Sequence, residues 1–216
     1  MSSESGFGDN KKYIVIAIVI STIIIISVFF SSNELNEAKI EDNILGDSWE
    51  EDLTDTDGGS KLLGLEKWVS YTYRNYNESF PAYITLTSMK TIFLLNEDEL
   101  IKRTKETIDQ ATNKNIILDK KNKTQGERVL LNGHKTQYII YEGIDKNDNE
   151  SIRIIGETWN CQTSGTSIIC IGYAKITNDL MTNNEHWAKI IKDGQGTFGI
   201  GKFMDTNGLI YNVKCH

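Results

Sequence analysis

Residues 13–30, YIVIAIVISTIIIISVFF, form a long apolar run without a charged residue. At about 1.5 Å per residue, a helix of this length reaches about 27 Å, enough to cross the hydrocarbon of a bilayer. We therefore predict one transmembrane helix. A cleaved signal peptide is the alternative. Its apolar region is usually about 7–15 residues long and ends in a small-x-small site, whereas this run ends in Phe29-Phe30.

The residues on either side of this run predict its orientation. Lys11 and Lys12 lie immediately before the run, and no basic residue follows it until Lys39. Lysine and arginine favour the cytoplasmic side of a membrane. The sequence thus predicts a single-pass protein of the cell membrane, with residues 1–12 in the cytoplasm and residues 31–216 outside.

Residues 31–60 are dominated by acidic and small polar residues. Between Glu34 and Asp57 there are ten acidic residues and one basic residue. Such a segment buries too little apolar surface to offset its chain entropy. We predict an acidic flexible linker, in which Trp49 is a solvated residue, with docking of Trp49 on the domain or on a partner as the alternative.

The residues from 61 onward show the periodicities of a folded domain. Residues 80–95 have the β-branched and aromatic content of a strand. Residues 97–112 repeat apolar positions at helical spacing, beginning with Leu100, and Asn96 supplies an N-cap before them. The pattern predicts an amphipathic helix over 97–112.

The remaining patterns predict mainly strands. Asn132-Gly133 is a strong hairpin signal within 127–143. We expect a loop at 120–126 and a short helix at 183–193. Strands are expected at 115–119, on both sides of Asn132-Gly133, and at 151–161, 166–176, 196–204 and 208–215. Consecutive strands joined by tight turns predict the α+β class, with an antiparallel β-sheet and helices packed on it, over residues 61–216.

This order of elements resembles the PsbP-like family over roughly residues 80–193. The resemblance is carried by LLNGHKTQYIIYEG, SIRIIGETW, TSIICIGYA and the following short helix with Trp187. It implies an antiparallel sheet with helices on its faces. It also implies a non-enzymatic binding or assembly domain, as in secreted or membrane-anchored members of the family in bacteria and archaea.

The charge of the chain argues against nucleic-acid binding. The net charge is -7, but residues 61–216 carry 18 acidic and 20 basic residues and are close to neutral. The acidity therefore belongs to residues 31–60. The domain lacks the basic stripe that nucleic acids require.

Two of the three cysteines, Cys161 and Cys170, lie in WNCQTSGTSIICIGY. If Gly165-Thr166 forms a two-residue hairpin loop, Cys161 faces Cys170 at a spacing that permits a disulfide. An exterior location favours oxidation. We predict this disulfide, with free buried thiols as one alternative.

The other alternative is a metal site formed by Cys161, Cys170, Cys215 and His216. Three thiolates and an imidazole are a valid zinc set. However, the spacing contains no short Cys-x-x-Cys knuckle, and adjacent Cys215 and His216 do not easily bind one ion. His134 follows a turn glycine and is expected to be solvent-exposed, and His186 is expected to pack beside Trp187.

No catalytic signature occurs: Gly-x-Ser-x-Gly, His-Glu-x-x-His and phosphate loops are all missing from the sequence. Glycosylation sequons begin at Asn77, Asn122 and Asn149. We therefore expect a membrane-anchored extracytoplasmic binding or assembly domain without catalytic activity or cofactor. Its expected partners are the bilayer, through residues 13–30, and another envelope or surface protein. The alternative is a metal- or redox-handling envelope protein.

Overall fold

A computed structural model describes residues 34–61, 64–75, 81–112, 115–176, 183–198 and 208–216 of the chain. Leu35–His216 forms one compact unit. Within these described residues, no helix has the length and apolar character needed to span a membrane. The predicted transmembrane run, the sequon at Asn77 and most of the predicted strand 196–204 lie outside them.

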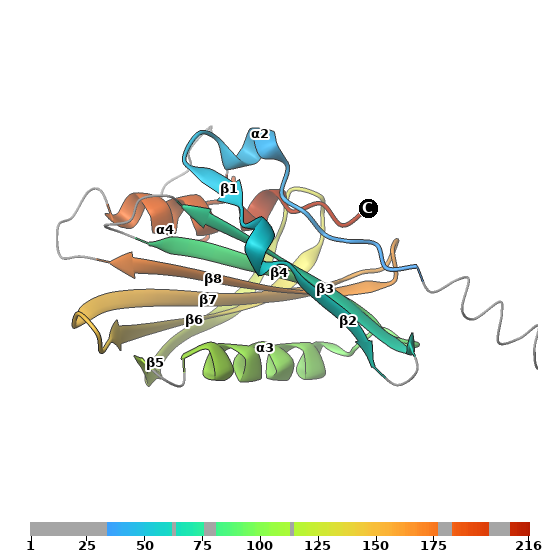
Figure 1. Cartoon of the computed structure of the whole chain (residues 1–216), viewed down its shortest axis with the longest axis horizontal. Coiled ribbons are helices and arrows are strands. Elements are labelled where there is room, and N and C mark those ends of the chain that lie inside the picture. Colours follow the sequence, from blue (N-terminus) through green and yellow to red (C-terminus); the bar gives the residue numbers. More distant parts are fainter. Residues whose placement is uncertain (1–33, 62–63, 76–80, 113–114, 177–182, 199–207) are drawn as a thin grey trace, which may run out of the picture. The chain divides into compact units, whose positions relative to one another are not determined.

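The described residues form an eight-stranded antiparallel sheet (Figure 1). Its order is β1-β3-β4-β8-β7-β6-β5, and β2 also pairs with β3. The strands are β1 (Trp49–Glu51), β2 (Asp57–Lys61), β3 (Glu66–Asn75), β4 (Ala82–Lys90), β5 (Ile116–Val129), β6 (Lys135–Asp145), β7 (Glu150–Cys161) and β8 (Thr166–Ile176). The helices are α2 (Asp42–Leu45), α3 (Glu97–Thr112) and α4 (Asn183–Ile191), with 3₁₀ helices η1 (Leu53–Asp55) and η3 (Ile210–Asn212). The predicted α+β class is confirmed.

Helix α3 spans the residues that the apolar periodicity predicts, and its N-cap is confirmed. The side chain of Asn96 accepts a hydrogen bond from the backbone N–H of Glu99 at 2.8 Å, which satisfies one of the unpaired amides of the first turn. The buried positions Leu100, Thr104 and Ile108 recur at helical spacing. They form the stripe that packs on the sheet.

Both faces of the sheet are covered, which explains the unbroken burial of its central strands. Helix α3 lies on one face, over β7 and its neighbours, while α4 packs against β8 on the other face (Figure 1). In β8 every residue from Thr166 to Ala174 is buried. Strands covered on both sides carry continuous apolar runs instead of an alternation.

Gly156 on β7 permits the close approach of α3 to the sheet. A Cβ atom at this position would lie 2.4 Å from Cγ2 of Thr104 and 2.9 Å from Cδ1 of Ile108. Contacts this short force the helix away from the strand. The glycine is therefore required by packing against α3.

We expect Gly156→Ala to lower the free energy of unfolding by about 1–3 kcal/mol, as overpacking of a close-packed core does. Thr104→Ser removes the methyl group in the shortest contact and should recover part of the loss in the double variant. Urea denaturation of the two single variants and the double variant measures this coupling. Equal losses with and without Thr104→Ser would contradict the contact.

The prediction of a flexible linker is wrong for residues 35–60. Ala38, Ile40, Leu45 and Trp49 are buried in the core, and both β1 and β2 pair with β3. The sparse apolar residues between the acids are spaced so that they reach the core, and the sheet edge supplies backbone partners. The domain therefore begins at Leu35, and Trp49 docks on it.

Two shorter predictions are also wrong. Residues 120–126 are not a loop but part of β5, which continues through a register shift between Leu118 and Lys123. Residues 208–215 are not a strand: they contain η3 and a single β-bridge at Lys214. Residues 123–126 are held by pairing with β6. Residues 209–213 are held by burial in the core and not by strand pairing. Tertiary contacts override the local residue pattern in both cases.

Candidate metal centre

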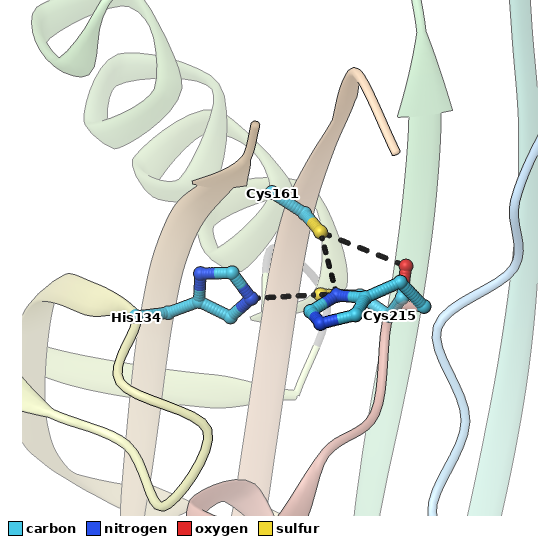
Figure 2. A group of neighbouring side chains, drawn as sticks. His134, Cys161 and Cys215 are labelled. Atoms are coloured by element: carbon cyan, nitrogen blue, oxygen red, sulfur yellow. Dashed lines mark hydrogen bonds between the residues drawn. The ribbon is translucent and has the colours of Figure 1, made fainter. Parts of the chain in front are cut away.

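Three segments that are distant in the sequence place cysteine and histidine side chains at one point. His134 comes from the β5–β6 turn, Cys161 ends β7, and Cys215 and His216 follow η3. One ligand atom from each of these four residues lies within 4.8 Å of the others. Figure 2 shows Cys161, Cys215 and His134 directed toward one another.

The distances between these atoms suit one tetrahedral ion. His134 Nε2 is 3.1 Å from Cys215 Sγ. His216 Nδ1 is 3.3 Å from Cys161 Sγ and 3.7 Å from Cys215 Sγ. Around a zinc ion with bonds of about 2.0–2.1 Å to nitrogen and 2.3 Å to sulfur, tetrahedral angles place N and S about 3.5 Å apart. These three nitrogen–sulfur distances are therefore close to those that one zinc ion requires, and all four ligand atoms lie within 4.8 Å of one another.

The β5–β6 turn brings His134 to this point and also holds residues 211–213 beside it. Gly133 adopts a φ of 84°, and Leu130 N–H donates to the carbonyl of His134 at 2.9 Å. The same turn donates from Leu131 N–H to Tyr211 O at 3.1 Å and from Asn132 Nδ2 to Val213 O at 3.0 Å. The hairpin that Asn132-Gly133 predicts is thus confirmed, with a connection longer than two residues.

The segment carrying Cys215 is held from its other side by the beginning of the domain. Lys39 and Lys214 exchange two backbone hydrogen bonds of 2.8 and 2.9 Å. Farther back, Leu209 N–H donates to Lys189 O at the end of α4, at 2.8 Å. Residues 208–216 are therefore fixed by long-range contacts to three separate parts of the fold.

The predicted register of the β7–β8 hairpin, and with it the Cys161–Cys170 disulfide, is wrong. Cys161 pairs with Thr166, and Cys170 pairs with Glu157. The connection contains four residues, 162–165, and Gly165 adopts a φ of 63°. Cys170 therefore lies four residues along β8 from the partner of Cys161, about 13 Å away, beyond the Cα separation that a disulfide allows. All three cysteines are free thiols in the structure.

The surroundings of Cys170 also make it unsuitable as a metal ligand. Its side chain is fully buried. Burial, together with the negative charge of Glu157, raises the pKa of the Cys170 thiol well above its usual value. A thiol that stays protonated in the core is a poor metal ligand.

The thiols of Cys161 and Cys215 affect each other's ionisation. Burial opposes ionisation of Cys161, but hydrogen bonds from Cys215, Ser164 and His216 outweigh it and lower the pKa of Cys161. Burial and the adjacent Cys161 thiolate raise the pKa of Cys215 to about 12. Burial, helped by the nearby His216, lowers the pKa of His134, which keeps this imidazole neutral. A neutral imidazole and a thiolate are the forms that bind metals.

Trp159 and a neighbouring cleft complete the surroundings of the cluster. The indole Nε1 of Trp159 is buried and makes no hydrogen bond within the described residues. Its N–H acts to lower the pKa of the Cys215 thiol, against the larger effect of burial. His134 and Trp159 also line a cleft of about 670 Å³. This cleft and the exposed side chain of His216 leave the cluster accessible from solvent.

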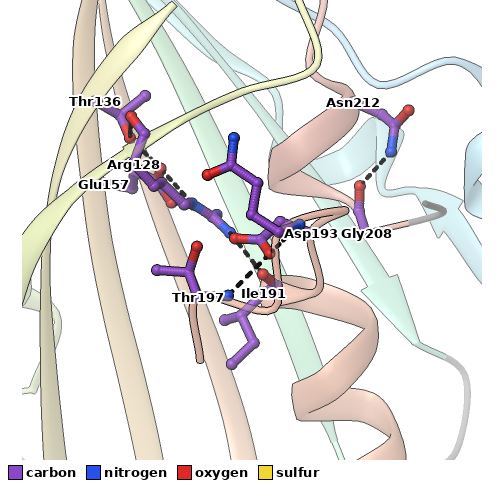
Figure 3. Close-up of polar contacts among 9 residues, drawn as sticks. Arg128, Thr136, Glu157, Ile191, Asp193, Thr197, Gly208 and Asn212 are labelled. Atoms are coloured by element: carbon purple, nitrogen blue, oxygen red, sulfur yellow. Dashed lines mark hydrogen bonds and ion pairs between the residues drawn. The ribbon is translucent and has the colours of Figure 1, made fainter. Parts of the chain in front are cut away.

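A second buried polar group lies apart from the cluster (Figure 3). Arg128 on β5 donates to both carboxylate oxygens of Glu157, at 2.8 and 2.5 Å. It also lies 3.4 Å from Asp193 and donates to Ile191 O at 2.6 Å. These contacts tie the residues that follow α4 to the centre of the sheet. The arginine and both carboxylates are hydrogen-bonded to one another or to neighbouring residues, which indicates a structural role.

The other expected site residues lie apart from the cluster. His186 contacts the amide of Asn75, with 2.7 Å between Nδ1 and Nδ2. Asn122 and Asn149 are exposed, although the amide of Asn122 donates to Asp119 at 2.9 Å. Glycosylation of these two sequons stays a prediction.

The structure thus unites three residues of the metal set considered from the sequence, namely Cys161, Cys215 and His216, and replaces Cys170 by His134. Adjacent Cys215 and His216 do point to the same place, contrary to the expectation that they would not. His134 was missed because its role depends on the long-range contact between the β5–β6 turn and residues 211–213.

Comparisons with protein-family models, with curated proteins and with solved structures gave no match for this chain.

Proposed function

We propose that this chain is a membrane-tethered, extracytoplasmic metal-binding domain that holds one Zn²⁺ ion through His134, Cys161, Cys215 and His216. The observation that carries the proposal is the convergence of four ligand atoms within 4.8 Å from three distant segments. The buried indole N–H of Trp159, which has no hydrogen-bond partner in the described residues and acts to lower the pKa of Cys215, adds support, because a nearby donor stabilises a thiolate ligand.

The donor set favours zinc. Two thiolates and two imidazoles in tetrahedral arrangement are a common zinc set, whereas hard cations such as Mg²⁺ and Ca²⁺ prefer oxygen ligands. Four protein ligands leave no open position for a substrate, which is the pattern of a binding or structural site. The domain is therefore proposed to bind, carry or sense the metal, and no catalytic step is assigned to it.

The proposal also includes attachment to a membrane and a role in binding, which do not depend on the metal cluster. Support for the tether is the uncharged run at residues 13–30 with Lys11 and Lys12 before it. The resemblance to PsbP-like domains is compatible with the antiparallel sheet and its covering helices. It favours a role in binding or assembly of other envelope components.

The test is titration of the reduced full-length chain, purified in detergent, with Co²⁺ followed by Zn²⁺. We expect one equivalent of Co²⁺ to give the intense visible bands of tetrahedral cobalt and a near-ultraviolet thiolate-to-cobalt band, which Zn²⁺ then abolishes. Lack of these bands would contradict the metal site. A Cys161–Cys215 disulfide in the chain as isolated, found by unreduced peptide mapping, would favour thiol redox chemistry at this pair instead.

A further inference from the structure

The end of the sheet at which β4 stops carries exposed apolar side chains. Phe93, in the connection from β4 to α3, is 82% exposed, and its neighbours Ile92 and Leu94 are 48% and 40% exposed. Leu65, just before β3, is 38% exposed. The start of β3 pairs with the end of β4, so these four residues, here named the apolar tip, lie at one end of the sheet. Clustered exposed apolar residues mark an interaction surface.

The chain enters the domain at this same end. Ile40 N–H donates to Oη of Tyr73 at 3.2 Å, and Ala38 N–H donates to Oγ of Ser88 at 2.7 Å. Tyr73 pairs with the β4 residue that lies four positions before Ser88. Followed backward toward Leu35, the segment therefore runs toward the end of β4, as its blue trace in Figure 1 shows.

Few residues separate Leu35, where the domain begins, from the predicted transmembrane run at residues 13–30. Only residues 31–34 lie between Phe30 and Leu35. Fully extended, the five steps from Phe30 to Leu35 span at most about 18 Å. A domain that begins at Leu35 must therefore stay close to the surface of any bilayer that holds residues 13–30, unlike a domain on a thirty-residue flexible linker.

We propose that the apolar tip inserts into the bilayer that holds residues 13–30, and thereby docks the domain on the membrane by this end of its sheet. The proposal rests on the membrane tether of the proposed function. The occupant is lipid because the short tether keeps the tip within reach of the bilayer, which gives the membrane a high effective concentration. Aromatic and aliphatic side chains on a loop are suited to the boundary between headgroups and acyl chains.

The charges around the tip indicate that insertion is driven by apolar burial. Lys61, Lys67 and Lys90 lie at the ends of the strands beside it. Glu66 follows Leu65 directly, and Glu97, Asp98 and Glu99 begin α3 after the tip. These charges offset one another, so attraction to anionic lipid contributes little. Docking should therefore occur on zwitterionic lipid and should resist added salt, since salt screens only the charged interactions.

The test uses the full-length chain in phosphatidylcholine vesicles and compares two labelled variants. Phe93→Cys places a fluorophore at the tip. Ile117→Cys, at a residue 57% exposed, is the matched control, because α3 separates the two positions by its 16 residues, about 24 Å of helix. The unsubstituted chain, whose cysteines are buried, gives the labelling background.

Lipids brominated in their acyl chains should quench the fluorophore at position 93 at least about twofold, at low and high salt, and leave the one at position 117 unchanged. Equal quenching at both positions overturns the docking. Lack of quenching at position 93 also overturns the docking, and disulfide cross-linking of the unlabelled Phe93→Cys chain to a second copy would then show that another copy covers the tip. If the chain fails to float with the vesicles, the predicted membrane tether is wrong, and the docking proposal is then wrong as well. Co²⁺ binding by the same preparation tests the metal site separately.

Discussion

Cys215→Ser is expected to weaken Zn²⁺ binding at least about 100-fold, because removal of a thiolate ligand costs more than the 10–100-fold typical of residues that only orient ligands. The side chain of Cys215 lies 3.1 Å from His134 and 3.7 Å from His216, so its loss opens the centre of the cluster. Competition of the bound metal against a chromophoric chelator measures the affinity.

Cys170→Ala is the matched control for this prediction. Cys170 is as buried as Cys161. However, it pairs with Glu157, four residues along the hairpin from the Cys161–Thr166 pair, and so lies away from the cluster. Its substitution should leave the metal affinity unchanged, even if it lowers stability slightly. An affinity that falls equally in both variants would mean that general loss of structure, not loss of a ligand, causes the effect.

His134→Gln tests the ligand that only the structure supplies. It should weaken metal binding and remove one nitrogen ligand from the cobalt spectrum, whereas His186→Gln should leave the spectrum unchanged. His186 makes its contact with Asn75, so the two variants compare histidines that are both engaged in the fold. An unchanged cobalt spectrum in His134→Gln would show that His134 is not a ligand and would leave Cys161, Cys215 and His216 as the candidate protein ligands.

Arg128→Met is expected to lower the free energy of unfolding by about 3–5 kcal/mol, because it leaves buried carboxylates without their positive partner. The side chains of Arg128 and Glu157 are 0% exposed, and that of Asp193 is 1% exposed. Equilibrium unfolding in urea measures the loss.

Two further variants separate the charge effect from packing. Arg103→Met breaks partly exposed ion pairs with Glu66 and Glu99 and should cost no more than about 1 kcal/mol. The double variant Arg128→Met with Glu157→Met removes both members of the closer ion pair, while Asp193 keeps the backbone N–H donors of Gln195 and Thr197, and it should recover part of the stability. If the double variant is less stable than Arg128→Met alone, the loss comes from packing and not from an unpaired charge.

Local sequence patterns were sufficient for elements whose stability is largely local. Helix α3 begins and ends where its apolar spacing and Asn96 cap predict. Strands β7 and β8 lie within one residue of their predicted bounds. In these segments, propensity, capping and hydrophobic pattern all favour the same structure, and burial in the sheet adds to them.

Predictions failed where a nonlocal contact decides the conformation. Residues 35–60 carry the acids of a disordered segment, yet Trp49 is buried and β2 completes the sheet beside β3. The hairpin register depended on whether the β7–β8 connection has two or four residues, a choice that pairing along the whole of both strands determines.

The sequence by itself determined the α+β class, the main helix and strands β4, β6, β7 and β8, and it placed three of the four candidate ligands in an alternative metal set, whereas β1, β2 and β3 were not predicted. Only the tertiary structure brought His134 to Cys215 and moved Cys170 away from Cys161. The physical reason is that a metal site needs side chains within a few ångströms, while the segments that carry them are positioned by turn length, strand register and the contacts of residues 208–216 with Lys39 and Asn132.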